Sequence, residues 1–264
     1  MPKFAANLTM LFTEVAMLDR PALAQQAGFD GAEVLFPYDH SIDAWQGALG
    51  DFPLLLINTP PGDWVAGDRG FAAVAGAQAQ FQDSFHRAAD YARALGAPHF
   101  SMPRVHVMAG VASGPQAEAV YLENLAWASA QAPDLMLVIE PLNPDDMPAY
   151  FLNDFDHAAR MIDDLGADNV RLQFDLWHAA KIHGNAWGVW QRHADIVGHI
   201  QIAGFPARAE PGGGGFDMTA LCDAVDGGGA AGGWIAAEYR PARATVHGLG
   251  WLAALKSRNQ LIGA

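Results

Sequence analysis

Eight short apolar runs with β-strand character alternate with helix-like stretches along the whole chain, and this alternation constrains the fold more than any other feature. The strand-like runs lie at 4–8, 29–36, 53–59, 99–103, 135–140, 170–175, 197–203 and 233–239. The helix-like stretches lie at 17–27, 41–49, 80–95, 115–131, 154–165, 185–194, 217–226 and 246–260. Such alternation predicts parallel strands joined by crossover helices. Eight units in 264 residues predict an α/β fold, a single (β/α)8 TIM-barrel domain over residues 1–264.

A doubly wound open sheet is the alternative arrangement of the same elements. That fold usually carries a glycine-rich phosphate-binding loop after its first strand. Here the corresponding segment reads NLTMLFTE, which has no glycine. The barrel is therefore favoured, and we expect no nucleotide cofactor.

Composition excludes several classes of protein. Charged residues make up 17% of the chain and hydrophobic residues 51%, which argues for a large interior and against disorder. The formal net charge of −14 repels phosphate backbones, so we expect no nucleic-acid partner. A single cysteine, Cys222, cannot form an intrachain disulfide. The sequence shows no secretory signal and no apolar run of membrane-spanning length, so we expect a cytoplasmic protein with no membrane contact.

Polar residues close four consecutive strand-like runs. Glu140 ends the fifth run, Asp175 ends the sixth, Gln201 lies near the end of the seventh, and Glu238 lies near the end of the eighth. In a TIM barrel these positions meet at the carboxyl-terminal mouth, where active sites are found. One acid at a strand end is commonly a helix cap or a solvated group. Three clustered carboxylates repel one another, and a divalent cation, Mg²⁺ or Mn²⁺, would relieve that repulsion.

Two further side chains are candidates for substrate binding near this mouth. His178 follows Asp175 by three residues and could face the same space. Arg208 lies on the loop after the seventh run and could bind an anionic substrate group. His199 should share the face of Gln201 one layer deeper in the barrel, because alternate residues of a strand point the same way.

Two glycine- and proline-rich segments are too long to be simple turns. They span 58–76 and 204–217, after the third and seventh runs. The first contains Asn58 and Arg69, which we assign as substrate-binding candidates, and it has the composition of a lid.

Distinctive motifs at these positions carry a resemblance to a known family. Those motifs are FAANLTMLF, AGFDGAEVLFPYD, NTPPGDWVAGDRG, YARALGA, ENLAWA, VIEPLN, QFDLWH, GHIQIA, PARAEPG and AAEYRP. In order and spacing they resemble hydroxypyruvate isomerases, in the xylose-isomerase-like TIM-barrel superfamily. The resemblance implies reversible conversion of hydroxypyruvate to tartronate semialdehyde. It implies that Glu140 and Glu238 are the acid–base pair, and that both bind the metal together with Asp175 and Gln201.

Three departures from the family pattern bear on the substrate. Gly204 follows QIA where the family usually has an acid, Gly215 replaces another acid, and Ile57 stands in place of a family histidine. The proposed metal ligands are unaffected, so these changes leave the identity of the small-molecule substrate open. An isomerase or epimerase of a related 2-oxo acid, such as a 2-oxo-tetronate, is the alternative.

Two other functions and the oligomeric state also stay open. A metal-dependent DNA endonuclease shares the fold, but it would need a histidine-rich multi-metal site and a basic surface. A non-catalytic sugar-binding barrel would not need two opposed glutamates. The sequence leaves a homo-oligomer open.

Overall fold

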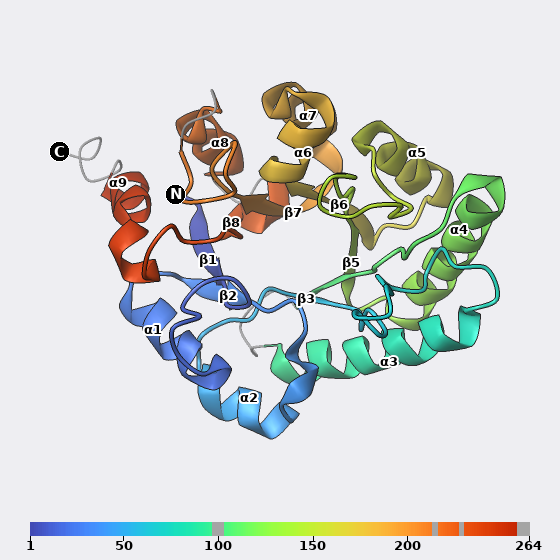
Figure 1. The fold of residues 1–264 in the computed structure, drawn as a ribbon, viewed down its shortest axis with the longest axis horizontal. Helices are drawn as coiled ribbons and strands as arrows, with labels where there is room; N and C mark the ends of the chain where they lie inside the picture. Colours follow the sequence, from blue (N-terminus) through green and yellow to red (C-terminus); the bar gives the residue numbers. More distant parts are fainter. Residues whose placement is uncertain (97–102, 213–215, 227–229, 258–264) are drawn as a thin grey trace.

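Eight parallel strands form a single sheet that closes into a ring (Figure 1). The computed structural model describes residues 1–96, 103–212, 216–226 and 230–257. The sheet order is β2-β1-β8-β7-β6-β5-β4-β3. Between the two end strands, the Ala32 amide donates to Pro53 O at 2.8 Å and the Leu55 amide donates to Ala32 O at 2.7 Å, which closes the ring. The strands are β1 (Lys3–Asn7), β2 (Gly31–Glu33), β3 (Leu56–Asn58), β4 (Arg104–His106), β5 (Met136–Ile139), β6 (Val170–Asp175), β7 (Val197–Ile202) and β8 (Trp234–Ala237).

Within the described residues, nine α-helices surround this ring, as expected for a TIM barrel (Figure 1). They are α1 (Arg20–Gln26), α2 (Ile42–Leu49), α3 (Gln78–Leu95), α4 (Gly114–Gln131), α5 (Phe155–Leu165), α6 (Leu176–His183), α7 (Ala186–His193), α8 (Met218–Val225) and α9 (Gly250–Ser257). The predicted fold class is confirmed. None of the helices in the described ranges has the length and apolar character needed to cross a bilayer.

Helix α5 shows how local sequence sets these elements. The Asp154 side chain accepts a hydrogen bond from the His157 amide at the start of the helix. Gly166, with a φ of 61°, ends it in the left-handed conformation that glycine favours. The buried residues of α5 recur at helical spacing and face the sheet: Phe155, Ala158, Met161 and Ile162.

The fourth strand lies later in the chain than the sequence predicts. The expected strand was 99–103, but β4 spans Arg104–His106, and 99–102 lie outside the described residues, as do Gly215 and 258–260. Arg104 is the first residue of β4 and carries a charged side chain. In the structure it is buried inside the barrel, where its guanidinium donates to Gly198 O at 2.6 Å and Ala231 O at 2.8 Å.

A helix that the sequence analysis did not predict follows the sixth strand. Only 185–194 was expected to be helical there, yet α6 begins directly after Asp175. The Asp175 carboxylate accepts a hydrogen bond from the Trp177 amide at 2.8 Å and so caps the helix. The last residue of β6 is therefore held by both elements.

Candidate active site

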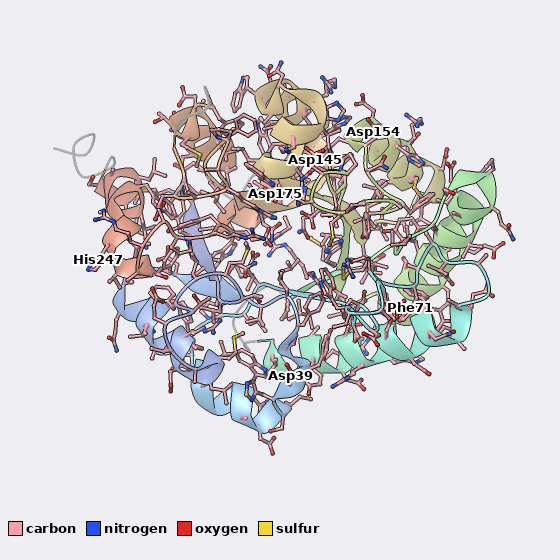
Figure 2. All side chains as sticks on the ribbon, viewed as in Figure 1. Asp39, Phe71, Asp145, Asp154, Asp175 and His247 are labelled. Atoms are coloured by element: carbon pink, nitrogen blue, oxygen red, sulfur yellow. The ribbon has the colours of Figure 1, made fainter. Side chains whose placement is uncertain are left out.

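A cavity of about 360 Å³ opens at the carboxyl-terminal mouth of the barrel. Its walls include residues that follow strands from all around the ring: Met10, Phe36, Asn58, His106, Glu140, His178, Arg208 and Glu238. In the view along the barrel, Asp175 lies near the centre of the ring, whereas Asp154 and His247 lie at its periphery (Figure 2). The size is at the small end for ligand pockets, which suits a small molecule.

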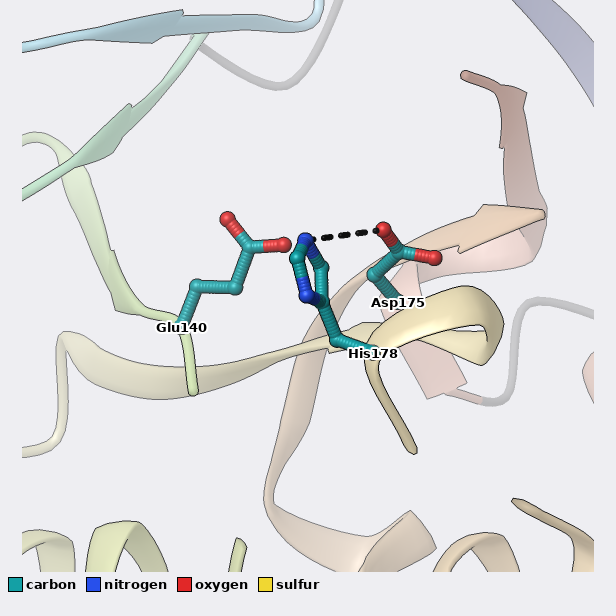
Figure 3. Close-up of side chains that lie close together, drawn as sticks. All are labelled: Glu140, Asp175 and His178. Carbon is teal, nitrogen blue, oxygen red and sulfur yellow. Dashed lines mark ion pairs between the residues drawn. The ribbon is translucent and has the colours of Figure 1, made fainter. Parts of the chain in front are cut away.

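Two of the predicted acids, Glu140 and Glu238, line this cavity, and Asp175 lies beside them. Glu140 directly follows β5, Asp175 ends β6, and Glu238 directly follows β8. One nitrogen of Arg208, Nη2, lies 3.1 Å from Asp175 Oδ2 and 3.1 Å from Glu238 Oε2, so those oxygens are at most twice that distance apart. A carboxylate oxygen of Glu140, a carboxylate oxygen of Asp175 and a ring nitrogen of His178 lie within 4.8 Å of one another (Figure 3).

Burial and mutual repulsion change the acidity of these carboxyl groups. Burial raises the pKa of Glu140 well above its ordinary value, and the charges of Glu238 and Asp175 raise it further. Burial likewise raises the pKa of Glu238 and the pKa of Asp175, while the Arg208 guanidinium opposes the rise in both. The cluster therefore holds protons at a pH where exposed carboxyl groups have lost them.

The contacts of His178 determine which of its nitrogens carries a proton. The backbone amide of Asn143 donates to His178 Nδ1 at 2.9 Å, so Nδ1 supplies a lone pair. Burial lowers the pKa of His178 well below its ordinary value, so the ring is neutral and its proton resides on Nε2. Nε2 lies 3.6 Å from Asp175 Oδ2, and a dashed line in Figure 3 marks this contact. His178 thus presents a hydrogen-bond donor to the cavity rather than a metal-binding lone pair.

Gln201 belongs to a buried polar layer beside Asp175. Strand register pairs it with Asp175, and its amide nitrogen donates to Glu33 Oε1 at 2.8 Å. Its carbonyl oxygen accepts a hydrogen bond from Gln173 at 2.8 Å, which leaves one lone pair on that oxygen. His199 contacts the other Glu33 oxygen at 2.7 Å, so it does lie deeper on the same face as Gln201.

Two buried residues of the site were missed by the sequence analysis. His106 ends β4 and lies with its Nδ1 at 3.4 Å from Glu140 Oε2; burial and then His199 lower its pKa to about 3, so it is neutral. It was missed because the fourth strand was placed too early. Glu33 was missed because it was assigned to the middle of the second strand, whereas β2 ends there.

The segment 58–76, called the third-strand segment because it begins at the end of β3, places its two substrate-binding candidates differently. Asn58 lines the cavity, and its buried Oδ1 has no hydrogen-bond partner among the described residues. Arg69 is not among the lining residues: its guanidinium donates to the Trp64 and Asp68 carbonyls and stacks over the Trp64 ring at 3.7 Å. Trp64 itself lines the cavity, so Arg69 contacts the wall of the cavity through this ring.

The acid cluster fits a divalent metal ion. Glu140 Oε1 is buried without a hydrogen-bond partner in the described part of the chain, and Asp175 and Glu238 both pair with the single charge of Arg208. Burying uncompensated carboxylates is costly, and a cation would remove that cost. Carboxylate and amide oxygens are ligands that suit Mg²⁺ and Mn²⁺.

Comparisons with known proteins agree with the barrel and its site. The family model described as "Xylose isomerase-like TIM barrel" matches residues 21–255. A 2-oxo-tetronate isomerase from Cupriavidus necator is 43% identical over 96% of this chain and 98% of its own length. A hydroxypyruvate isomerase from Escherichia coli is 38% identical over the same shares of the two chains.

Solved structures extend the likeness to three dimensions. A crystal structure from Brucella melitensis, described as an AP endonuclease of family 2, has a TM-score of 0.89 and 36% identity, covering 96% of this chain and 99% of that one. An L-ribulose 3-epimerase, at a TM-score of 0.73 and 18% identity, covers 100% of this chain and 98% of its own and shares the fold. The resemblance expected from the motifs is confirmed: the chain belongs to the xylose isomerase-like TIM barrel family and is an isomerase.

Proposed function

We propose that this enzyme interconverts a small 2-oxo acid and its hydroxy-aldehyde or hydroxy-ketone isomer, with hydroxypyruvate and tartronate semialdehyde as the first pair to test. The observation that carries the proposal is the pair of buried glutamates, Glu140 and Glu238, at the base of one small cavity. Strands β6 and β7 separate β5 from β8, so the two carboxyl groups reach the cavity from different sides. A 2-oxo-tetronate is the second candidate because the Cupriavidus necator relative carries that name.

The chemistry follows from what these groups can hold and release. Moving a carbonyl to the neighbouring carbon requires a proton to leave one carbon and another to be added to the next. In this mechanism one glutamate removes the proton from the hydroxyl-bearing carbon, the other adds a proton to the former carbonyl carbon, and the hydroxyl proton passes to the former carbonyl oxygen. In the metal-free site burial raises the pKa of both glutamates toward the working pH, where a general acid–base group is most efficient. A bound Mg²⁺ or Mn²⁺, held by Glu140, Asp175, Gln201 and Glu238, would supply electrostatic stabilisation of the enediolate.

The remaining residues of the cavity orient the substrate. His178 Nε2 donates a hydrogen bond to a substrate oxygen, and the unpartnered Asn58 Oδ1 accepts one from a hydroxyl. Arg208 supplies the positive charge that a substrate carboxylate needs. Arg69 acts indirectly, by holding Trp64 over the opening.

A screen of 2-oxo acids and simple sugars in deuterated buffer with Mg²⁺ or Mn²⁺ tests the proposal. We expect deuterium to enter the carbon-bound positions of hydroxypyruvate or a 2-oxo-tetronate, together with formation of the isomer. Exchange with neither acid would refute the proposal. Binding of a sugar without exchange would identify a sugar-binding barrel, and cleavage of abasic-site DNA would identify the endonuclease function.

The affinity for Mn²⁺ should rise steeply with pH. Metal binding requires ionised carboxylates, and protons compete until the pH exceeds the pKa of each group. Because the pKa values of Glu140, Asp175 and Glu238 are raised, the increase should continue above about pH 6, where ordinary carboxyl groups with pKa values of about 4 no longer compete. Calorimetry across this range measures the slope, and Glu140→Gln should make it shallower. A flat profile above about pH 6 would contradict raised pKa values in the cluster.

The tip of the third-strand segment should close over a bound substrate. Its base is held, because Gly70 pairs with Ala109 and a Cβ on Gly70 would lie 2.4 Å from Met108 O. The tip is open: Val65 is 97% exposed and Trp64 is 42% exposed, although Trp64 lines the cavity. Closure would exclude water from a reactive intermediate.

Hydrogen exchange with and without a substrate analogue measures this closure. We expect protection of residues 62–69 and little change in the anchored part of the segment that starts at Gly70. Equal exchange of 62–69 in both states would show that the segment is not a lid.

A further inference from the structure

Arg208 contacts two of the carboxylates that would hold a metal. Its Nη2 donates to Asp175 Oδ2 and to Glu238 Oε2, each at 3.1 Å. The Arg208 side chain is 15% exposed, so these ion pairs lie largely out of water. A divalent cation bound to the same oxygens, at about 2.0–2.6 Å, would lie close to the guanidinium and repel it strongly.

The Arg208 guanidinium uses only some of its hydrogen-bond donors. Nη2 makes both contacts with the carboxylates, so neither of them is the paired, fork-like arrangement that binds arginine best. The buried Nε has no hydrogen-bond partner among the described residues. Arg208 therefore has donors left for another acceptor, and a substrate carboxylate has the geometry to use them.

The loop that carries Arg208 is anchored, so relocation would involve the side chain. The Gly204 amide donates to Ala209 O, and the Arg240 amide donates to Arg208 O, both at 2.8 Å. A Cβ on Gly204 would lie 2.2 Å from Glu210 O, which shows how closely the loop packs on itself. Arg208 also lines the cavity, so its displaced guanidinium would remain beside a bound substrate.

We propose that Arg208 is an internal cation that competes with the divalent metal for Asp175 and Glu238, and that its displaced guanidinium binds the substrate carboxylate. This inference rests on the proposed function, because it takes the substrate to be an anionic 2-oxo acid. Metal binding and carboxylate binding then favour each other. By thermodynamic linkage, each must strengthen the other by the same factor.

The competition is tested directly by calorimetric measurement of Mn²⁺ binding to the whole protein without substrate. The measurement is made at about pH 8, because protons then compete least with the metal for the carboxylates. Arg208→Met removes the charge but keeps an unbranched side chain. We expect it to bind Mn²⁺ about tenfold more tightly than the wild type, the change that corresponds to 1.4 kcal/mol. The matched control is Arg240→Met, which removes a charge from the wall of the same cavity; its side chain has no hydrogen bond or ion pair with the acids in the described residues. It should change the affinity much less.

The second arm tests the coupling with propionate, a carboxylate that lacks the neighbouring oxygen needed for chelation. In the wild type, propionate should tighten Mn²⁺ binding about fivefold or more, the lower end of usual coupling factors. In Arg208→Met this effect should vanish, and in Arg240→Met it should persist. Circular dichroism spectra that match the wild type would show that each variant is folded. Arg208→Lys keeps a positive charge, so it should restore part of the competition with Mn²⁺.

Equal or weaker Mn²⁺ binding by folded Arg208→Met would overturn the competition. Coupling that survives in Arg208→Met but disappears in Arg240→Met would overturn the second half and identify Arg240 as the anion-binding residue. These outcomes are independent of turnover. If the competition is observed while no 2-oxo acid is isomerised, the proposed function alone fails.

Discussion

Glu140→Gln and Glu238→Gln are each expected to lower the rate of isomerisation by about 10²–10⁴-fold, the usual contribution of a general acid–base group. Both carboxyl groups are buried in the cavity, and burial raises the pKa of each. A carboxamide of the same shape does not exchange protons at neutral pH, but its carbonyl oxygen can still bind a cation. Steady-state rates and solvent-deuterium exchange with the substrate identified in the screen measure the loss.

The metal content of each glutamine variant separates the two roles assigned to these glutamates. A variant that keeps its metal and loses proton exchange has lost an acid–base group. The matched control is Glu118→Gln, because Glu118 lies on α4 and its partly exposed carboxylate contacts His157 away from the cavity. Wild-type turnover by either Glu140→Gln or Glu238→Gln at saturating metal would eliminate the two-glutamate mechanism.

Asp175→Asn should abolish tight metal binding and lower turnover at least 10²-fold. A metal ion supplies several kcal/mol of charge stabilisation, and each 1.36 kcal/mol corresponds to a factor of ten in rate. Asparagine removes the charge but can still accept the hydrogen bond from the Trp177 amide, so the cap of α6 is kept. Inductively coupled plasma mass spectrometry gives the bound metal, and circular dichroism reports the fold.

Asp154→Asn is the control for that variant. Asp154 caps α5 through the His157 amide, just as Asp175 caps α6, but it lies at the periphery of the barrel (Figure 2). It therefore loses the same charge and keeps the same kind of cap, and metal binding should not change. If Asp175→Asn retained its metal and its activity, Asp175 would be a helix cap only.

The sequence predicted the barrel well because its signal is local and repeated. Most of the strands and helices are marked by apolar spacing and by caps such as Asp154 and Gly166, which act within a few residues. The strand-end acids followed from the same reasoning, since topology alone brings the ends of parallel strands to one mouth. The error at β4 has the opposite origin: Arg104 is stabilised inside the barrel by carbonyl groups of Gly198 and Ala231, far away in sequence.

The sequence by itself determined the fold class and the end of the barrel at which Glu140, Asp175 and Glu238 meet. Only the tertiary structure decided how these groups touch: that Arg208 lies between Asp175 and Glu238, and that Glu33 holds both His199 and Gln201. It likewise decided that Arg69 contacts its own loop and Trp64 rather than the cavity. The reason is physical. Hydrophobic periodicity is a property of neighbouring residues, whereas burial, pKa and side-chain contacts depend on groups that come together only when the ring closes.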